Sequence, residues 1–307
     1  MCFPIFCSAS KRTPRSVRSP MRCAQCGENT MSEVPFPVST QGGGMTLYKA
    51  KLKELKQLSQ KKYRDEQKKF LVEGLRLVGE AARSDFPILE AFYIEEIETD
   101  GQGKKLIAML KRKTPNVYKV THRELATVTD TVTAQGIAAV LRQREYTADR
   151  ILHCSDGQCT LVAFDGIADP GNVGSMVRTC DWFGVNGILI GRNSVELYNP
   201  KVLRGTMGGV FHLPIADGVD LLSAISHAKE LGFKVYVTDP HGETHFDHVS
   251  YEAKSLIVFG NEAWGVSDQV KQLADVRLVI RRYGAGESLN VAVACGIVLS
   301  ALHRLYD

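Results

Sequence analysis

The sequence lacks three features that would each identify a class of protein. A membrane-spanning helix needs about 20 consecutive apolar residues; the longest apolar stretch, 289–302, is shorter and is followed by His303 and Arg304, so we expect no membrane role. The eight cysteines are scattered without the regular spacing of a disulfide framework, which favours a reducing compartment. A strand, G-x-G-x-x-G and helix in succession is also missing, which disfavours a nicotinamide-dependent dehydrogenase.

The N-terminal region, 1–44, lacks hydrophobic periodicity and has no acidic residue before Glu28. Its prolines and Gly42-Gly43-Gly44 predict a disordered extension, or one that is not native if translation begins at Met45. Its basic, Ser-containing start resembles a mitochondrial transit peptide, but the prolines oppose the required amphipathic helix. We therefore expect a cytoplasmic protein, with a mitochondrial location as the alternative.

Metal ligands with suitable spacing are scarce. Cys23 and Cys26 have zinc-knuckle spacing, but no second pair completes four ligands nearby. His241, His245 and His248 could be metal ligands, but a polar loop explains them more simply. We expect no metal.

Length and charge distribution indicate a two-domain protein with a basic segment. A chain of 307 residues with 44% hydrophobic content can bury two cores. The net charge is +4, and lysines cluster in 49–69, as suits either a polyanion or a solvated helix face. The candidates for RNA binding in this segment are Lys61, Lys62, Arg64 and Lys68.

The region 45–144 predicts a small α/β domain. Leucines recur at helical spacing from Leu47 to Leu58, and another helix should follow Gly74 and run through Ala82. Strands are expected at 70–72, 88–94, 117–120 and 137–141, with a helix at 104–113. The polar residues after 144 suggest a linker over 145–157.

The region 158–307 alternates strands and helices, which predicts a mostly parallel sheet with helices on both faces. Strands are expected at 160–164, 187–190, 233–238, 255–259 and 276–280, and helices at 219–231 and 266–273. Ligands bind such sheets outside the carboxyl ends of the strands. Thr238, the segment 260–265 and Ile280 stand at those ends.

A helix is expected after Pro170, with an apolar stripe that leaves Arg178 on the opposite face. Gly171, Gly174 and Ser175 lie behind Arg178, and such small residues would let a nucleic-acid backbone approach its guanidinium. A solvated arginine is the alternative.

The segment 289–302 predicts a helix that is apolar on every side, and therefore central to a core or at an interface with another chain. Glu287, Ser288 and Asn290 precede it, where the first backbone N–H groups of a helix lack partners. Ser288 would either cap the helix or face a ligand.

Three stretches together resemble the motifs of the SpoU or TrmH-type branch of the SPOUT RNA 2′-O-ribose methyltransferases. They are 169–174 (DPGNVG) with Arg178, 258–262 (VFGNE) with Gly265, and 287–291 (ESLNV). The residues Tyr63-Arg64, the stretch 70–74 (FLVEG) and the stretch 135–137 (QGI) resemble the ribosomal-protein-like substrate domain of the same enzymes. The resemblance implies a trefoil-knotted fold, a homodimer, S-adenosylmethionine as cofactor and an RNA substrate, with ribosomal RNA favoured over transfer RNA by analogy.

The resemblance also implies roles for individual residues. Asn172, Arg178, Glu262, Ser288 and Asn290 would face the reacting ribose, and Thr238, Gly260, Ile280 and Leu289 would contact the cofactor. Arg281 stands where the family usually has proline, so the resemblance does not determine the conformation of the following loop or its substrate contacts. Arg178, held by Asn172, would either bind the adjacent phosphate and polarise the hydroxyl or abstract its proton. A catalytically silent RNA-binding protein on the same fold is the alternative function.

Overall fold

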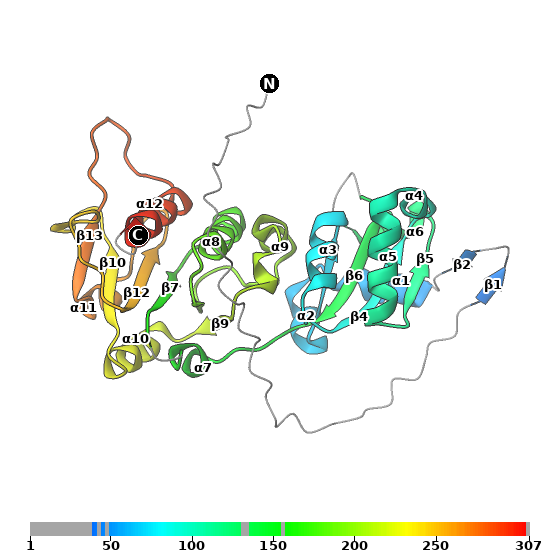
Figure 1. The fold of residues 1–307 in the computed structure, drawn as a ribbon, viewed down its shortest axis with the longest axis horizontal. Coiled ribbons are helices and arrows are strands. Elements are labelled where there is room, and N and C mark those ends of the chain that lie inside the picture. The colour runs from blue at the N-terminus through cyan, green and yellow to red at the C-terminus, as the bar shows by residue number, and fades with distance from the viewer. Residues whose placement is uncertain (1–38, 42–43, 47–48, 130–134, 155–156, 305–307) are drawn as a thin grey trace, which may run out of the picture. The chain divides into compact units, whose positions relative to one another are not determined.

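The computed structural model describes residues 39–41, 44–46, 49–129, 135–154 and 157–304 (Figure 1). Residues 1–38 of the predicted extension, including Cys23 and Cys26, therefore lie outside the described residues. At the end of the predicted extension, residues 39–41 and 44–46 form a short antiparallel hairpin that the sequence did not predict. The hairpin consists of β1 (Ser39–Gln41) and β2 (Gly44–Thr46).

The first half of the described chain is a four-stranded sheet with helices. Its sheet order is β3-β6-β4-β5, in which β6 pairs antiparallel with both β3 and β4, and β4 pairs parallel with β5. The elements are α1 (Lys49–Gln57), α2 (Lys61–Gln67), β3 (Lys69–Glu73), α3 (Leu75–Arg83), β4 (Ile88–Tyr93), α4 (Glu95–Thr99), α5 (Gly101–Lys113), β5 (Val117–Lys119), α6 (His122–Val128) and β6 (Ile137–Arg142). The small α/β fold expected here is present.

The second half is a seven-stranded sheet in the order β11-β13-β10-β12-β7-β8-β9, and every pairing in it is parallel. The elements are α7 (Ala148–Leu152), β7 (Cys159–Asp165), α8 (Pro170–Trp182), β8 (Gly187–Gly191), α9 (Pro200–Thr206), η1 (Gly209–Phe211), β9 (Ile215–Val219), α10 (Leu221–Glu230), β10 (Lys234–Thr238), β11 (Thr244–His245), β12 (Lys254–Gly260), α11 (Asp268–Gln272), β13 (Val276–Val279) and α12 (Val291–Arg304).

Helices cover both faces of this sheet, as the alternation of elements predicted. Successive residues of a strand point to opposite faces. Val162 and Phe164 of β7 join the buried cluster that contains α8, α9 and α12. Leu161 and Ala163 join a second cluster with α7, α10 and α11. The central strands are therefore buried on both sides, as in other parallel sheets.

Several short elements differ from the sequence-based expectation. Residues 148–152 of the expected linker form α7, which buries Ile151 and Leu152. The helix expected from Val219 starts at Leu221, because 215–219 form β9. A disulfide joins Cys154, after α7, to Cys159 at the start of β7.

The two halves share one buried cluster of side chains. Phe70 of β3 packs against Tyr198 with ring centroids 4.5 Å apart and tilted planes, and Phe86 packs edge-on against Phe211 with ring centroids 5.1 Å apart. The Tyr198 hydroxyl also hydrogen-bonds both the N–H and the C=O of Arg144, each over 2.9 Å. Aromatic and polar contacts thus hold the small sheet against α9 and η1.

In the parts of the chain that the structure describes, every helix is too short or too polar to cross a bilayer.

Candidate active site

The first turn of α8 places Asn172 at the carboxyl edge of the parallel sheet. Asp169 caps the helix, because its Oδ1 accepts a hydrogen bond from the Asn172 backbone N–H over 2.9 Å. Pro170 occupies the first helical turn, where a missing N–H costs nothing. The DPGN sequence therefore starts the helix directly after β7 and its loop.

A chain of hydrogen bonds joins the three motif segments at this edge. Asn172 Nδ2 donates to Glu262 Oε1 over 2.7 Å, and Asn290 Nδ2 donates to Asn172 Oδ1 over 3.0 Å. The backbone N–H of Ala168 contacts the second carboxylate oxygen of Glu262 at 3.4 Å. Three of the five predicted ribose-facing residues are thus brought together, and Asn172 is their link.

Asn290 also caps α12. Its Oδ1 accepts from the N–H groups of Ala292 (2.9 Å) and Val293 (3.3 Å), so α12 begins at Val291 rather than at Leu289. The capping role considered for Ser288 belongs to Asn290, because Ser288 lies two residues too early. Within the described residues Ser288 is exposed and has no hydrogen-bond partner.

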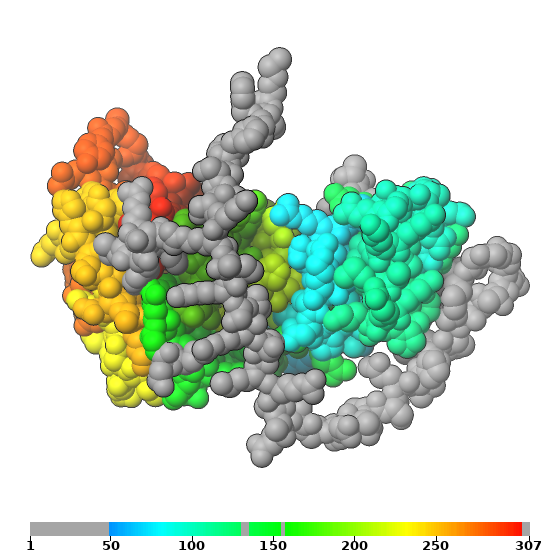
Figure 2. Space-filling view, in the orientation of Figure 1, coloured from blue at the N-terminus to red at the C-terminus, as the bar shows by residue number. Residues whose placement is uncertain are grey.

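The loop between β13 and α12 lies in solvent. All residues from Arg281 to Asn290 are exposed, and the loop projects from the surface in Figure 2, in orange. Arg282 Nη1 donates to the carbonyl of Gly286 over 3.2 Å. Arg281, the departure from the family pattern, is part of this loop.

The turn after β12 folds back on itself and carries Glu262. A Cβ on Gly260 would lie 2.1 Å from the backbone nitrogen of Val266, so only glycine fits there. Asn261 and Gly265 exchange two backbone hydrogen bonds of 2.9 Å each. The buried Asn261 side chain donates to the carbonyl of Gly166 over 2.6 Å. Asn261 belongs to the VFGNE stretch, but the sequence alone assigned it no role; the capacity of its amide to bridge two loops was the available signal.

The predicted cofactor residues divide into two groups. Thr238, Gly260 and Ile280 follow or end the neighbouring strands β10, β12 and β13, whose carboxyl ends share one edge. Thr238 Oγ1 donates to the carbonyl of Val258 over 3.1 Å. Leu289, in contrast, is 50% exposed in the projecting loop.

Arg178 is exposed on α8, opposite Val173, Met176, Val177 and Cys180, which are fully buried. The predicted orientation is therefore confirmed. Among the described residues Asn172 bonds through its side chain to Glu262 and Asn290 and makes no hydrogen bond to Arg178, so the expectation that Asn172 holds Arg178 stays a prediction.

The interpretation that Gly174 lets a nucleic-acid backbone approach Arg178 is wrong. A Cβ there would lie 2.7 Å from the Cα of Gly205 and from the carbonyl oxygen of Val202. The residue is small because α8 packs closely on α9, and it does not open α8 to a nucleic-acid backbone.

α12 packs on α8 beneath the polar chain. Cys180 of α8 and Cys295 of α12 are both free thiols that lie fully buried. Burial, reinforced by the neighbouring Cys295, raises the pKa of Cys180 well above its ordinary value, so this thiol stays protonated and unreactive. The outward side of α12 is not covered: Val293 is 50% exposed.

The four predicted RNA-binding residues have different environments. Lys61 and Lys62 are exposed, as that role requires. Lys68 is exposed too but pairs with Glu145 over 2.7 Å, and this hydrogen bond raises its pKa.

The prediction that Arg64 binds RNA has to be corrected, because its side chain is only 2% exposed. It donates to the carbonyl of Leu58 over 2.7 Å and forms an ion pair with Glu196. Burial raises the pKa of Glu196, although Arg64 acts in the opposite direction. Arg64 therefore joins the two halves of the chain.

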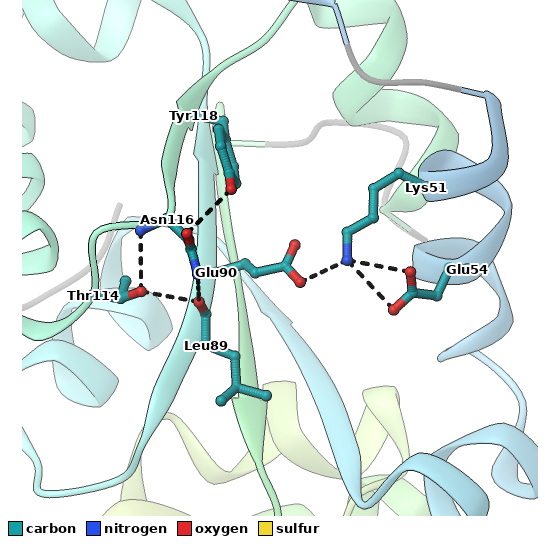
Figure 3. Close-up of polar contacts among 7 residues, drawn as sticks. All are labelled: Lys51, Glu54, Leu89, Glu90, Thr114, Asn116 and Tyr118. Atoms are coloured by element: carbon teal, nitrogen blue, oxygen red, sulfur yellow. Dashed lines mark hydrogen bonds and ion pairs between the residues drawn. The ribbon is translucent and has the colours of Figure 1, made fainter. Parts of the chain in front are cut away.

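Another lysine of the basic segment is used within the small domain. Lys51 donates to Glu90 over 2.6 Å and to Glu54 over 3.2 Å, as Figure 3 shows. Burial disfavours the charged amine, but the two carboxylates outweigh it and raise the pKa of Lys51. Beside them Thr114 and Asn116 both donate to the carbonyl of Leu89, over 2.9 and 3.2 Å (Figure 3).

Among the residues that the structure describes, two groups of side chains have the spacing of metal ligands: Asp149 with His153 and His227, and His245 with Asp247 and His248. In each group histidines already bond to the carboxylate; His245 and Asp247, for example, are in direct contact. The expectation that no metal takes part stays a prediction.

Comparison with known proteins agrees with this arrangement. Residues 160–300 match the SpoU rRNA Methylase family, and residues 49–139 match the MRM3-like substrate binding domain. A curated relative, the 23S rRNA (guanosine(2553)-2′-O)-methyltransferase RlmP of Bacillus subtilis (strain 168), is 31% identical over 252 residues, which cover 81% of this chain and 94% of the relative.

Solved structures have the same fold. An AdoMet-bound rRNA methyltransferase from Sinorhizobium meliloti superposes with a TM-score of 0.75 at 26% identity, over 85% of this chain and 97% of that one. The SpoU methyltransferase AviRb from Streptomyces viridochromogenes, in complex with AdoMet, gives a TM-score of 0.76 at 24% identity, over 84% and 98%. The chain therefore belongs to the SpoU family of RNA methyltransferases.

Proposed function

We propose that this protein transfers a methyl group from S-adenosylmethionine to a ribose 2′-hydroxyl of ribosomal RNA. The observation that carries the proposal is the hydrogen-bond chain Glu262–Asn172–Asn290, which joins all three motif segments at the carboxyl edge of the parallel sheet. Ligands bind at that edge in folds of this kind. The 23S rRNA specificity named for the Bacillus subtilis relative favours ribosomal over transfer RNA.

The residues at the edge fit the cofactor. Gly260 is the last residue of β12, Thr238 offers a hydroxyl, and Ile280 offers an apolar side chain. These residues, with Leu289 from the loop, would hold S-adenosylmethionine. When bound, the cofactor supplies an electrophilic methyl group on a sulfonium sulfur.

The chain's own polar residues would position the ribose. Glu262 accepts a hydrogen bond from the Asn172 side-chain nitrogen and so fixes the direction of the amide. Asn290 donates to the Asn172 side-chain oxygen. Fixed side chains lower the activation barrier of methyl transfer because they hold the reacting groups in line, an effect that can contribute up to about 7–11 kcal/mol. Ser288 would complete the ribose site from the loop.

Arg178 would bind the phosphate next to that ribose and polarise the hydroxyl. Its exposed position leaves the guanidinium fork accessible, and a fork can hold two oxygens at once. Proton abstraction by Arg178 is the second role, and it requires a guanidinium that has lost its proton, which is normally forbidden in proteins.

A homodimer accompanies this proposal. Val293 on α12 and Leu289 before it are each 50% exposed, and Trp182 on α8 is 83% exposed. Burying such apolar surface stabilises association by about 25 cal/mol per Å². We also propose the trefoil knot expected from the resemblance; the position of β12 between the earlier strands β10 and β7 supports it.

The experiment is methyl transfer from labelled S-adenosylmethionine by the purified protein. Ribosomal RNA lacking its natural methyl groups and unmodified transfer RNA serve as parallel substrates, and 2′-O-methyl mapping locates the product. Incorporation into ribosomal RNA alone supports the proposal, and incorporation into transfer RNA alone shifts the substrate. RNA binding without incorporation into either would identify a silent RNA-binding protein.

A further inference from the structure

Trp264 lies on the turn that carries Glu262, and its side chain is 73% exposed. The turn is held in one conformation by the paired hydrogen bonds between Asn261 and Gly265 and by the bond from Asn261 to Gly166. The indole is therefore exposed to solvent on a rigid turn, two residues from Glu262, whose carboxylate accepts the hydrogen bond from Asn172.

The neighbouring loop has the same character. It follows β13, which is separated from β12 only by β10 in the sheet, so both loops leave the same edge. This loop contains Arg281, Arg282 and Tyr283, all exposed, with Tyr283 at 86%; Figure 2 shows it projecting beside the body of the sheet domain. Aromatic rings with arginines are the side chains that proteins use to bind unpaired RNA, through stacking and phosphate contacts.

We propose that Trp264 is a stacking platform for an unpaired base beside the nucleotide whose ribose is methylated. The inference rests on the proposed function. A ribose that enters the edge of the sheet has to leave the regular stack of its RNA strand, which removes base stacking on at least one side. The indole replaces that stacking, and because every base has a π-face it does so without selecting a base. Trp264 is thus a positioning residue.

The sequence offers a direct binding test, because it contains only two tryptophans. Trp182→Phe leaves Trp264 as the single indole, and Trp264→Phe leaves Trp182, which is exposed on α8. The probes are a short oligoadenylate and an abasic ribose-phosphate chain of equal length. We expect oligoadenylate to quench Trp264 fluorescence while the abasic chain does not, and Trp182 to respond to neither. Equal quenching by both chains, or quenching confined to Trp182, would overturn the proposal.

A kinetic test separates stacking from a structural role. Trp264→Ala should raise the KM for ribosomal RNA roughly 5- to 100-fold, with kcat and cofactor affinity nearly unchanged, and Trp264→Phe should restore most of the loss. Trp182→Phe, which keeps an aromatic ring in the proposed dimer surface, is the control. A Trp264→Phe variant as poor as Trp264→Ala, or a Trp264→Ala protein with altered oligomeric state, would contradict a stacking role. Because the fluorescence test needs no methyl transfer, failure of the proposed function would leave its result readable.

Discussion

Asn290 and Asn172 are 118 positions apart in the sequence, yet the amide of Asn290 donates to the side-chain oxygen of Asn172 over 3.0 Å. The carbonyl oxygen of the same Asn290 side chain caps α12. One side chain thus stabilises a helix with its oxygen and the candidate active site with its nitrogen. Substitutions can separate these two functions.

Asn290→Asp should keep the cap and lose the link. A carboxylate still accepts from the first N–H groups of α12, but it cannot donate to Asn172. We expect a melting temperature close to that of the unsubstituted protein and a methyl-transfer rate at least tenfold lower. Asn290→Ala should lose both, with about 0.5–2 kcal/mol of stability removed with the cap. Full activity in Asn290→Asp would show that the Asn290–Asn172 bond is dispensable.

Arg178→Ala should reduce methyl transfer by orders of magnitude without changing cofactor affinity or oligomeric state. The reason is its place on α8, exposed and opposite the buried stripe. Arg178→Lys keeps the charge but not the fork, so it should recover RNA affinity more than rate. Single-turnover methylation, calorimetry with the cofactor and sedimentation measure the three properties. A fully active Arg178→Ala protein would remove this residue from the mechanism.

Arg64 and Glu196 should differ in what their loss costs. Arg64→Ala leaves a buried carboxylate and the Leu58 carbonyl without their partner, which typically costs about 3–5 kcal/mol. Glu196→Gln leaves the Arg64 guanidinium without a counter-charge, but the amide oxygen can still accept its hydrogen bond and no unfavourable buried carboxylate remains, so its cost should be smaller. Urea unfolding followed by circular dichroism gives both values, with Lys61→Ala as an exposed control.

The same pair predicts a pH effect. The pKa of Glu196 in the folded protein is raised above its ordinary value of 4.5, so the folded state binds this proton more tightly than the unfolded state. The stability contributed by Glu196 is therefore present below pH 4.5 and decreases as the pH rises through the raised pKa. Glu196→Gln should lack that decrease. Parallel pH profiles for the two proteins would contradict the argument.

Gly174→Ala should destabilise the protein by about 1–3 kcal/mol through overpacking. The added methyl group would meet the backbone of α9 at 2.7 Å, and backbone cannot move aside as a flexible side chain can. Ser175→Ala, at the exposed neighbouring position, is the control and should have little effect. A neutral Gly174→Ala variant would mean that α8 and α9 separate easily.

Lys61 and Lys62 should contribute to RNA affinity through phosphates alone. Each exposed lysine that neutralises a phosphate adds about 0.7–0.9 to the slope of log affinity against log salt. The double Ala variant should bind RNA more weakly with a shallower slope and an unchanged cofactor affinity. Lys68 is left intact because its ammonium group pairs with Glu145 over 2.7 Å, so its removal would also leave that carboxylate without its partner. An unchanged slope would mark the two lysines as a solvated surface.

Much of the fold could be predicted from the sequence, because strands such as β7 and β12 are continuous apolar runs and buried parallel strands have that composition. Short elements were missed for the opposite reason. β9 contains Asp217 and Gly218, which interrupt any apolar run, and α7 has only five residues, too few for helical periodicity.

For the site, motif positions were more informative than interactions. Asn172, Glu262 and Asn290 were named together, and they meet in the structure. Their partners could not be inferred, since a hydrogen bond between residues so distant in sequence depends on the whole sheet. Arg64 shows the same limit: in a lysine-rich segment it reads as another surface cation, and only the fold brings Glu196 to it.

The arrangement of the parallel sheet also bears on how the protein forms during synthesis. Cys159 at the start of β7 pairs with Lys254 at the start of β12, so the middle of the sheet stays open until most of the chain has left the ribosome. Contacts between residues far apart in sequence form slowly, and an unpaired apolar strand is prone to aggregate while it waits. The nascent chain should therefore depend on chaperones late in translation, and the candidate active site, which needs all three loops, is assembled last.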